Sequence, residues 1–379
     1  MAALLAIGAA LASGGSETDS VRQRYLPGPN ALRTVARFGA ERVVTLGSLG
    51  NPDLVRDDPG WLAAARPLGP EAPAWAQSMY MRSLLVLHAL TDPNMGAAIA
   101  GARAGWAYVW PRDASAVAMA LAAAGYRSEA RRIVRFLSGL DLGAAARFHR
   151  DGTPVDGRAA QGDAAGWVAA AATAVGLPGA TARRSSWRGL ADYQENGDGD
   201  LLANAIASGA SRIRALFGTP SDTLSRRAGD PGSGIDSAAA WAVRPFPRPG
   251  LYPPIRRTLL RLAARSGRFG IVPSQDWGGG VDPWTAPTAW TAWSLAALGE
   301  RHAALRLMAE LRRAATPVGL LPERVNSRTG IPTSTTPLAW SHAFAILALR
   351  ARYGGSAWGV IRSPRPGPPS PLRPRSRPG

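Results

Sequence analysis

The sequence predicts an all-α protein in which helical hairpins close into a toroid. Apolar runs of helical length recur from about residue 76 onward, and each ends at Gly, Pro or an Asp-Gly pair. Several neighbouring runs are joined by very short links, which forces the two helices into an antiparallel hairpin. Strand-like alternation is scarce, so a parallel α/β sheet is disfavoured.

The expected helices follow one another along most of the chain. Many are rich in alanine and carry arginine near their ends, where positive charge interacts favourably with the helix dipole. In chain order they cover residues 78–91, 113–124, 128–142, 160–176, 200–217, 255–265, 285–299, 301–315 and 338–352. The pairs 113–124 with 128–142 and 285–299 with 301–315 are the clearest hairpins. Upstream, residues 22–44 alternate in part, and residues 47–60 are rich in Gly, Asp and Pro.

Repeated hairpins fit two architectures, an open solenoid and a closed toroid. A solenoid should show a repeat period of about 34 to 47 residues. The sequence has no such repeat, and long loops that carry tryptophan separate the hairpins, which suits a toroid with its loops gathered at one end. We expect three segments: an apolar N-terminal segment at 1–27, the helical domain at 28–355, and a disordered Pro/Arg-rich tail at 356–379.

The basic charge does not by itself indicate a nucleic-acid partner. All 44 basic residues are arginine, and the formal net charge is +18. A nucleic-acid binder gathers basic residues on one element and interleaves them with aromatic residues that stack on bases. Here the arginines are scattered along helix surfaces or lie in the tail. We therefore expect no nucleic-acid binding.

The residues that bind metals and most cofactors are missing or wrongly spaced. The chain has no cysteine, which excludes disulfides, thiolate catalysis and cysteine-ligated zinc. Its four histidines never fall at metal-ligand spacing, and the Gly278–Gly280 run lacks the Lys-Ser/Thr of a phosphate-binding loop. We expect neither a metal nor a cofactor.

We expect the protein in the cytoplasm, with export or N-terminal anchoring through residues 2–12 as alternatives. Residues 2–12 are apolar and end in small residues, like a signal peptide, but no positive residue precedes them. They are also too short to span a bilayer, and no later apolar segment is long enough for an internal membrane span. The oligomeric state is not determined by the sequence.

Four segments carry residues suited to carbohydrate chemistry. In GWAYVWPRD, Arg112 beside Asp113 can grip neighbouring sugar hydroxyls next to Trp110, or Asp113 can simply cap a helix. In QGDAAG, a helix cap is the plainer interpretation of Asp163. DYQEN contains Glu195, and SQDWGGGVDPW ends at Trp284.

The segment from Leu320 to Ala343 is the most informative part of the chain. It places Glu323 between two Leu-Pro turns and ends with Trp340 at the start of an apolar helix. A carboxylate near an indole can move a proton while the ring covers a sugar, although an exposed glutamate in a loop is ordinary.

Elimination leaves two glutamates. The chain has eight, at positions 17, 41, 71, 129, 195, 300, 310 and 323. The first three precede the helical region, Glu300 starts a helix, and Glu129 and Glu310 sit on arginine-rich helix faces. Glu195 and Glu323 remain, both in loops. Hydrolysis of a glycosidic bond needs two carboxyl groups, one on each side of the bond.

Five segments resemble motifs of glycoside hydrolase family 15, the glucoamylase family, and occur in the family's order. They are AYVWPRDA, QGDAAG, DYQEN, DWGGGVDPWTAPTAW and GLLPERVNSRTGIPTSTTPLAWSHA. The resemblance implies an (α/α)6 toroid of the six-hairpin glycosidase type that hydrolyses the α-glucosidic bonds of an α-glucan or α-glucoside, acting from the chain end with inversion. On this likeness Glu195 is the general acid and Glu323 the general base. The implied substrate-binding residues are Trp110, Arg112, Asp113, Asp163, Trp284 and Trp340.

The chain departs from the family pattern around the acid. Gln194 stands where the family usually has Trp, Asn196 stands where fungal members have a second carboxylate, and Val272 stands where they have an arginine. Two alternatives therefore accompany the hydrolase prediction. One is a catalytically degenerate glycan-binding protein on the same fold, and the other is a helical-repeat interaction protein whose tryptophans are core residues.

Overall fold

The structure is a computed structural model that describes residues 22–25, 32–38, 42–46, 59–101, 105–177, 187–278, 280–317 and 319–354. It is rich in helix and has little sheet. The signal-like stretch at 2–12 and the tail at 356–379 lie outside the described residues, so the three-segment division stays a prediction.

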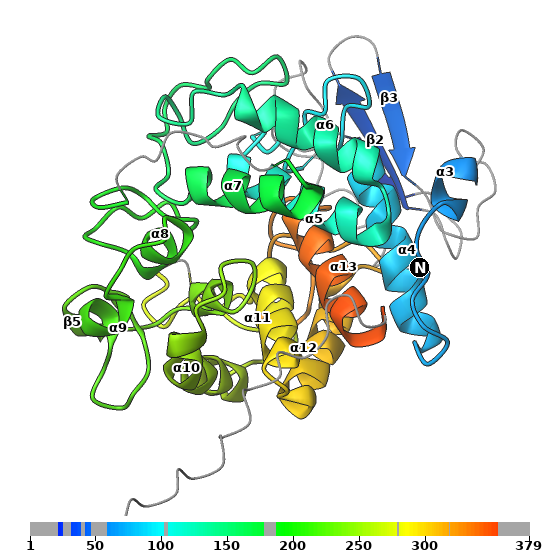
Figure 1. Cartoon of the computed structure of the whole chain (residues 1–379). Helices are drawn as coiled ribbons and strands as arrows, with labels where there is room; N and C mark the ends of the chain where they lie inside the picture. The colour runs from blue at the N-terminus through cyan, green and yellow to red at the C-terminus, as the bar shows by residue number, and fades with distance from the viewer. Residues whose placement is uncertain are drawn as a thin grey trace, which may run out of the picture.

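Six helical segments form a closed inner ring, as Figure 1 shows around its centre. They are α5 (Pro111–Ala124), α7 (Ala164–Val175), α8 (Leu202–Ala207), the 3-10 helix η2 (Ser237–Ala242), α11 (Thr285–Ala297) and α13 (Ala339–Tyr353). Each contacts the next in this order, and α13 packs against α5. Because the ring closes, the fold is the expected toroid and not an open solenoid.

A second set of helices packs on the outside of this ring. It consists of α4 (Ala74–Ala89), α6 (Arg127–Ser138), α9 (Ile213–Phe217), α10 (Tyr252–Ala264) and α12 (Arg301–Ala314). The predicted hairpins are confirmed, since α6 packs on α5 and α12 on α11. Outer helices bury one face only, as α6 does with Ile133, Val134 and Leu137, whereas α13 is buried almost throughout.

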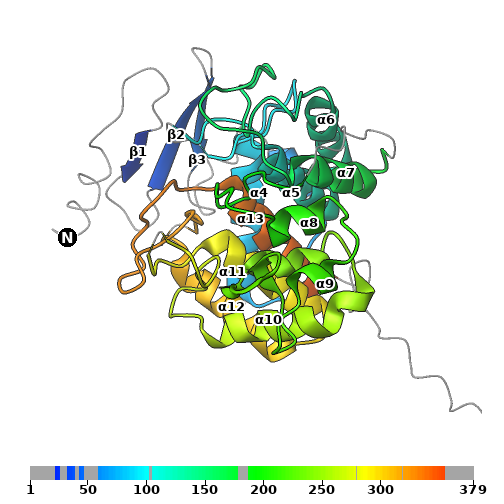
Figure 2. The same cartoon turned by 90° about the vertical axis from the view of Figure 1, so that its left-hand side faces the viewer.

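The strands are few and lie apart from the ring. Strands β1 (Arg22–Tyr25), β2 (Leu32–Phe38) and β3 (Arg42–Leu46) form an antiparallel sheet in that order. Figure 2 shows this sheet beside the helical body, where β3 contacts α4. A short hairpin of β4 (Ser225–Arg227) and β5 (Asp230–Ile235) lies between α9 and η2 in the chain. Two further short helices are α3 (Pro59–Ala63) and η3 (Pro249–Leu251).

Several expected helix boundaries differ from the structure, two of them for a clear local reason. The helix expected over 200–217 is two short helices, because Gly209 and Arg212 both have positive φ and interrupt it. The helix expected over 128–142 ends at Ser138, with Gly139 at its C-cap. The end of α5 follows the expected rule, since Gly125 takes the left-handed conformation that lets the chain turn back into α6.

Aromatic side chains fill the middle of the ring. Trp290 of α11 meets Trp241 of η2 and Trp340 of α13 edge to face, at ring-centroid distances of 5.4 Å and 5.2 Å. Trp167 of α7 packs on Trp241 in the same way. Such pairs contribute about 0.5–1.5 kcal/mol each beyond the burial of their surface. Within the described part of the chain, no helix is long and apolar enough to cross a membrane.

Candidate active site

The predicted site segments meet at the N-terminal ends of inner-ring helices. Trp110 is the N-cap of α5, Asp163 that of α7 and Trp284 that of α11, while Trp340 is the second residue of α13. Pro111 occupies the first position of α5, where its missing N–H group leaves no donor unsatisfied. Closure of the ring therefore brings together segments that are far apart in the chain.

Arg112 is the centre of a buried polar cluster. Its Nη1 donates to Gln161 Oε1 at 2.7 Å and to Asp163 Oδ2 at 3.2 Å, and its Nε lies 3.2 Å from Asp113 Oδ1. The guanidinium also stacks over the Trp340 ring, 4.8 Å from the centroid. These contacts hold Arg112 in one orientation.

Neither aspartate of this cluster is a simple helix cap. Asp163 occupies the N-cap position of α7 but makes no capping hydrogen bond there, and its Oδ2 binds Arg112 instead. Asp113 is not the N-cap of α5 and pairs with Arg112. Asp163 Oδ1 is buried without a hydrogen-bond partner among the described residues. Asp163 has no exposed surface, so a ligand hydroxyl can reach this oxygen only if neighbouring side chains move.

Burial dominates the electrostatics of Asp113. The pKa of Asp113 is raised to about 7, chiefly by burial; the negative charges of Asp163 and Glu323 add to the rise and Arg112 opposes it. The influence of Glu323 on this carboxyl places the two groups in one electrostatic neighbourhood, although their segments are far apart in sequence.

Glu323 is half-buried and held from several sides. Its N–H donates to Thr335 O at 2.9 Å, and its carbonyl accepts from Thr285 N at 3.0 Å. Its carboxylate accepts hydrogen bonds from Ser334 Oγ and from the Trp106 side chain. Burial raises the pKa of Glu323, while the Ser334 bond, the Arg324 charge and the Trp106 bond lower it.

The loop of Glu323 is also anchored to the helices behind it. Leu321 N donates to His342 Nε2 at 2.9 Å, so this nitrogen is unprotonated and Nδ1–H faces Ser83 Oγ at 2.9 Å. Burial lowers the pKa of His342 to about 3, so the ring stays neutral and can keep accepting. The link joins the loop to α13 and α4.

Glu195 is placed differently. Its side chain is 42% exposed and forms an ion pair with Arg158. Arg158 also acts electrostatically on Glu323. Arg158 therefore connects the two glutamates, one through direct contact and the other through its charge.

The three predicted tryptophans belong to the core. Trp110, Trp284 and Trp340 are 5%, 8% and 3% exposed. Trp340 supports Arg112 on one side and the aromatic centre on the other, and Trp284 packs edge to face on Trp277 at 5.1 Å. In this structure they do not offer a sugar an open ring face. The reason is that each stands at or next to the start of an inner helix, where the ring closes over it.

Several residues of the site are absent from the sequence-based prediction. Gln161, Ser334 and Trp106 contact the predicted residues directly, and each lies in a segment already singled out or immediately before it. Nothing in the sequence distinguished Arg158 and Arg226 as site residues, because scattered arginines are common in this chain. No group of residues suited to hold a metal occurs in the ranges that the structure covers.

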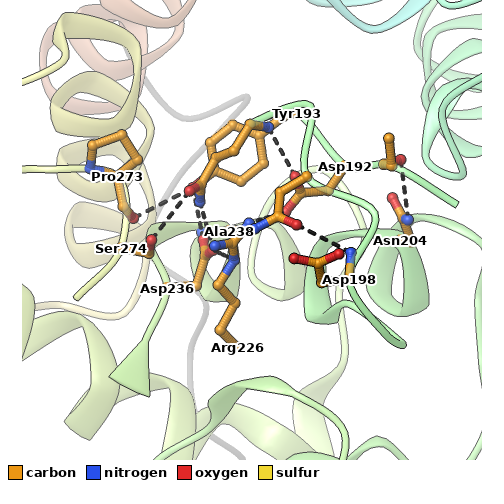
Figure 3. Close-up of polar contacts among 12 residues, drawn as sticks. Asp192, Tyr193, Asp198, Asn204, Arg226, Asp236, Ala238, Pro273 and Ser274 are labelled. Carbon is orange, nitrogen blue, oxygen red and sulfur yellow. Dashed lines mark hydrogen bonds and ion pairs between the residues drawn. The ribbon is translucent and has the colours of Figure 1, made fainter. Parts of the chain in front are cut away.

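A second buried cluster surrounds Arg226 of β4, as Figure 3 shows. The guanidinium faces Asp192, Asp236 and Asp276. Burial raises the pKa of Asp236 to about 7; Arg226 opposes the shift and Asp192 adds to it. Asp192 also acts on Arg112, so the two clusters are neighbours.

Comparison with known proteins gives one family match. Residues 74–142 match the sequence profile of glycosyl hydrolases family 15. This segment includes Arg112 and Asp113 but neither glutamate. A search of curated proteins finds no match.

Solved structures resemble most of the chain. A glycosidase variant in complex with glucose is 21% identical, with a TM-score of 0.60 over 73% of this chain and 96% of that one. A bacterial glucoamylase complexed with acarbose is 16% identical, with a TM-score of 0.61 over 79% and 58%. The glucoamylase from Saccharomycopsis fibuligera is 14% identical, with a TM-score of 0.57 over 73% and 94%.

At these identities the structural likeness shows the fold, and the family match adds support for a glycosidase function. The chain thus has the (α/α)6 toroid fold of the glucoamylases, and its residues 74–142 carry the sequence signature of family 15 glycoside hydrolases.

Proposed function

We propose that the protein is an inverting, exo-acting glycoside hydrolase that cleaves α-glucosidic bonds at a non-reducing end. The observation that carries this proposal is the arrangement of Glu323 beside the Arg112 cluster. The backbone of Glu323 is held by hydrogen bonds, and Ser334 and Trp106 orient its carboxylate. A carboxylate fixed in this way suits a general base that must orient a water molecule for attack.

The Arg112 cluster suits the recognition of a terminal sugar. Arg112 is fixed by Gln161 and Asp163, so it can present its remaining donor to a hydroxyl without losing further freedom. Asp163 Oδ1 supplies an acceptor in the same place. A fixed donor beside an acceptor matches two neighbouring hydroxyls of a glucosyl ring.

The charge of the region also fits the reaction. The buried carboxylates outnumber the buried arginines around Arg112 and Arg226. Glycosidic bond cleavage passes through an oxocarbenium-like transition state with positive charge on the sugar. A surplus of negative charge stabilises that state more than the neutral substrate.

In this proposal Glu195 donates the proton to the leaving oxygen and Glu323 activates the water. Inversion requires the two carboxyl groups to stand about 6.5–9.5 Å apart in the substrate complex. An arginine contact favours a charged carboxylate, so Arg158 has to leave Glu195 before that residue can act as an acid. The incoming sugar would take its place.

One observation favours a second candidate, a glycan-binding protein without turnover. The Glu195 side chain is 42% exposed and paired with Arg158, which is not the environment of a protonated acid. If Arg158 stays in place when sugar binds, the site can hold a ligand but cannot protonate it.

Glu195→Gln and Glu323→Gln distinguish the two candidates. The wild-type protein and both variants are assayed for glucose release from maltose, isomaltose, trehalose and dextrin. For an enzyme we expect each variant to lower kcat about 100- to 10,000-fold. A binding protein shows no turnover in any form, while the variants keep their affinity for the sugar.

Glu129→Gln is the matched control, because Glu129 lies on the outer helix α6 and pairs only loosely with Arg132, at 3.9 Å. It should leave kcat unchanged. The anomer of the released glucose tests the stereochemistry: β-glucose is expected first, and initial release of α-glucose would contradict inversion.

A further inference from the structure

Arg226 lies in the hairpin of β4 and β5 and has an unusual environment. Its side chain is only 2% exposed, and three carboxylates surround it. Nη2 lies 3.1 Å from Asp192 Oδ2, Nε lies 3.4 Å from Asp236 Oδ2, and Nη1 lies 3.2 Å from Asp276 Oδ1. Burying so many charged groups is unfavourable unless the geometry is well satisfied, so the cluster is a specific arrangement rather than a casual ion pair.

Two of these carboxylates hold the turn that leads to Glu195. Asp192 Oδ1 accepts from Gln194 N at 2.9 Å, and Asp192 O accepts from Glu195 N at 2.9 Å. Asp192 N in turn donates to Asn196 O at 3.1 Å. Asp192 thus organises the backbone on both sides of Glu195.

Asp236 holds the side chains of the same turn, as the dashed lines of Figure 3 show. Its Oδ1 accepts from Tyr193 Oη at 2.8 Å, and its Oδ2 accepts from Gln194 Nε2 at 2.9 Å. Ser274 Oγ completes the set by donating to Gln194 Oε1 at 3.1 Å. The residue before Glu195 is therefore fixed at both ends of its amide.

The backbone of Glu195 needs such support. Its φ is +58°, a left-handed conformation that residues other than glycine rarely adopt. Strained conformations of this kind persist only where the surrounding contacts determine them fully. The three residues before Glu195 are each tied to Arg226 or Asp236, and these contacts are what hold the strained turn.

We propose that Arg226 is a positioning residue that, through Asp192 and Asp236, holds the turn of residues 192–196 in the conformation that presents the Glu195 carboxyl to the substrate. This inference rests on the proposed role of Glu195. The planar guanidinium is essential to it. Its two Nη atoms donate to Asp192 and Asp276 while its Nε lies 3.4 Å from Asp236, and the single ammonium of a lysine cannot reproduce this arrangement.

The test uses Arg226→Lys in the full-length protein, since lysine keeps the positive charge that the buried carboxylates require. We expect kcat on the best substrate to fall about 10- to 100-fold, as a misplaced catalytic group does. KM should stay within about twofold of the wild-type value because Arg226 makes no contact with Arg112. The affinity for maltose should also stay within about twofold; it is measured calorimetrically in a Glu323→Gln background. Arg256→Lys, at an exposed pair with Glu300, is the control.

Hydrogen–deuterium exchange measures the stability of the turn directly and does not depend on turnover. Peptides covering residues 192–196 should exchange at least about 10-fold faster in Arg226→Lys than in the wild type. In the double variant with Glu195→Gln, kcat should fall no further than in Glu195→Gln alone, because both changes act on one group.

The outcomes separate the two proposals. Unchanged exchange at 192–196, unchanged kcat, or loss of maltose affinity in parallel with kcat would each overturn the positioning role. Faster exchange in a protein whose wild type has no turnover would instead overturn the hydrolase function and leave only the structural link between Arg226 and the turn of residues 192–196. Should Arg226→Lys fail to fold, the same measurements are made on Gln194→Met. This change removes the contacts of the Gln194 amide with Asp236 and Ser274 and leaves the ion pairs of Arg226 in place.

Discussion

At the scale of single residues, Glu323 shows how a carboxyl group is tuned by competing neighbours. Burial raises its pKa, and the hydrogen bond from Ser334 is the largest of the effects that lower it. A general base works in its ionised form. The donors around Glu323 therefore widen the pH range in which it can activate water, and Ser334 is the donor whose removal leaves the rest of the loop in place.

Ser334→Ala should move the acid limb of the kcat/KM profile to higher pH. The sign follows because losing a bond that favours the charged carboxylate raises the pKa of Glu323 further, so more base is protonated at a given acidic pH. The profile is measured on the best substrate from acid to neutral pH. Ser327→Ala, on the same loop, should leave the limb unmoved, and a shift to lower pH in Ser334→Ala would refute the assignment.

At the scale of elements, the inner ring depends on close approach between neighbouring helices. Gly166 lies in the first turn of α7, and a Cβ built there would stand 2.0 Å from the carbonyl oxygen of Ala207, at the end of α8. The neighbour is backbone, so it cannot rotate away. The glycine therefore sets the spacing between α7 and α8, and with it the position of Asp163 at the start of α7.

Gly166→Ala should lower the free energy of unfolding by about 1–3 kcal/mol, because α7 must shift to relieve the overlap. Chemical denaturation measures the change. Gly250→Ala is the matched control, since a Cβ at Gly250 meets no atom within 4 Å. Equal stability of the two variants would show that the α7–α8 contact is looser than the structure indicates.

At the scale of the whole molecule, the ring closes on a shared aromatic centre. Trp241, Trp290 and Trp340 come from three different inner segments and pack on one another directly or through Trp290. Displacing η2, α11 or α13 would expose part of this centre. This differs from a solenoid, in which each repeat contacts only its neighbours.

We therefore expect the helical domain to unfold in one cooperative transition. Far-ultraviolet circular dichroism follows the helices, and near-ultraviolet dichroism follows the packed tryptophans. The two melting curves should coincide. Curves that separate clearly would indicate independent helical units and would favour the interaction-protein alternative.

The helices were predictable from the sequence because helix formation is largely encoded by local periodicity. The expected run at 285–299 is α11, ending at Ala297, and the run at 301–315 is α12, ending at Ala314. The break between α8 and α9 was not predictable from apolar periodicity, since it depends on positive φ at Gly209 and at Arg212, a residue that rarely adopts it.

The candidate site was predictable only in part. Glu323, Arg112 and Asp113 emerged from motif chemistry and family resemblance, and the structure places them in one neighbourhood. Their roles, and that of Glu195, stay predictions. Trp110 and Trp340 are both buried where the inner helices begin, and their role as substrate-binding residues stays a prediction.

By itself, the sequence determined the helical elements, the order of the motifs and the choice of two loop glutamates, because these depend on residue type and on spacing along the chain. The tertiary structure alone decided which distant residues meet: Arg112 with Gln161 and Asp163, and Arg226 with its three aspartates. The physical reason is that buried charges can be paired only after the ring has closed and excluded water, so their partners are set by the geometry of that closure and not by local sequence.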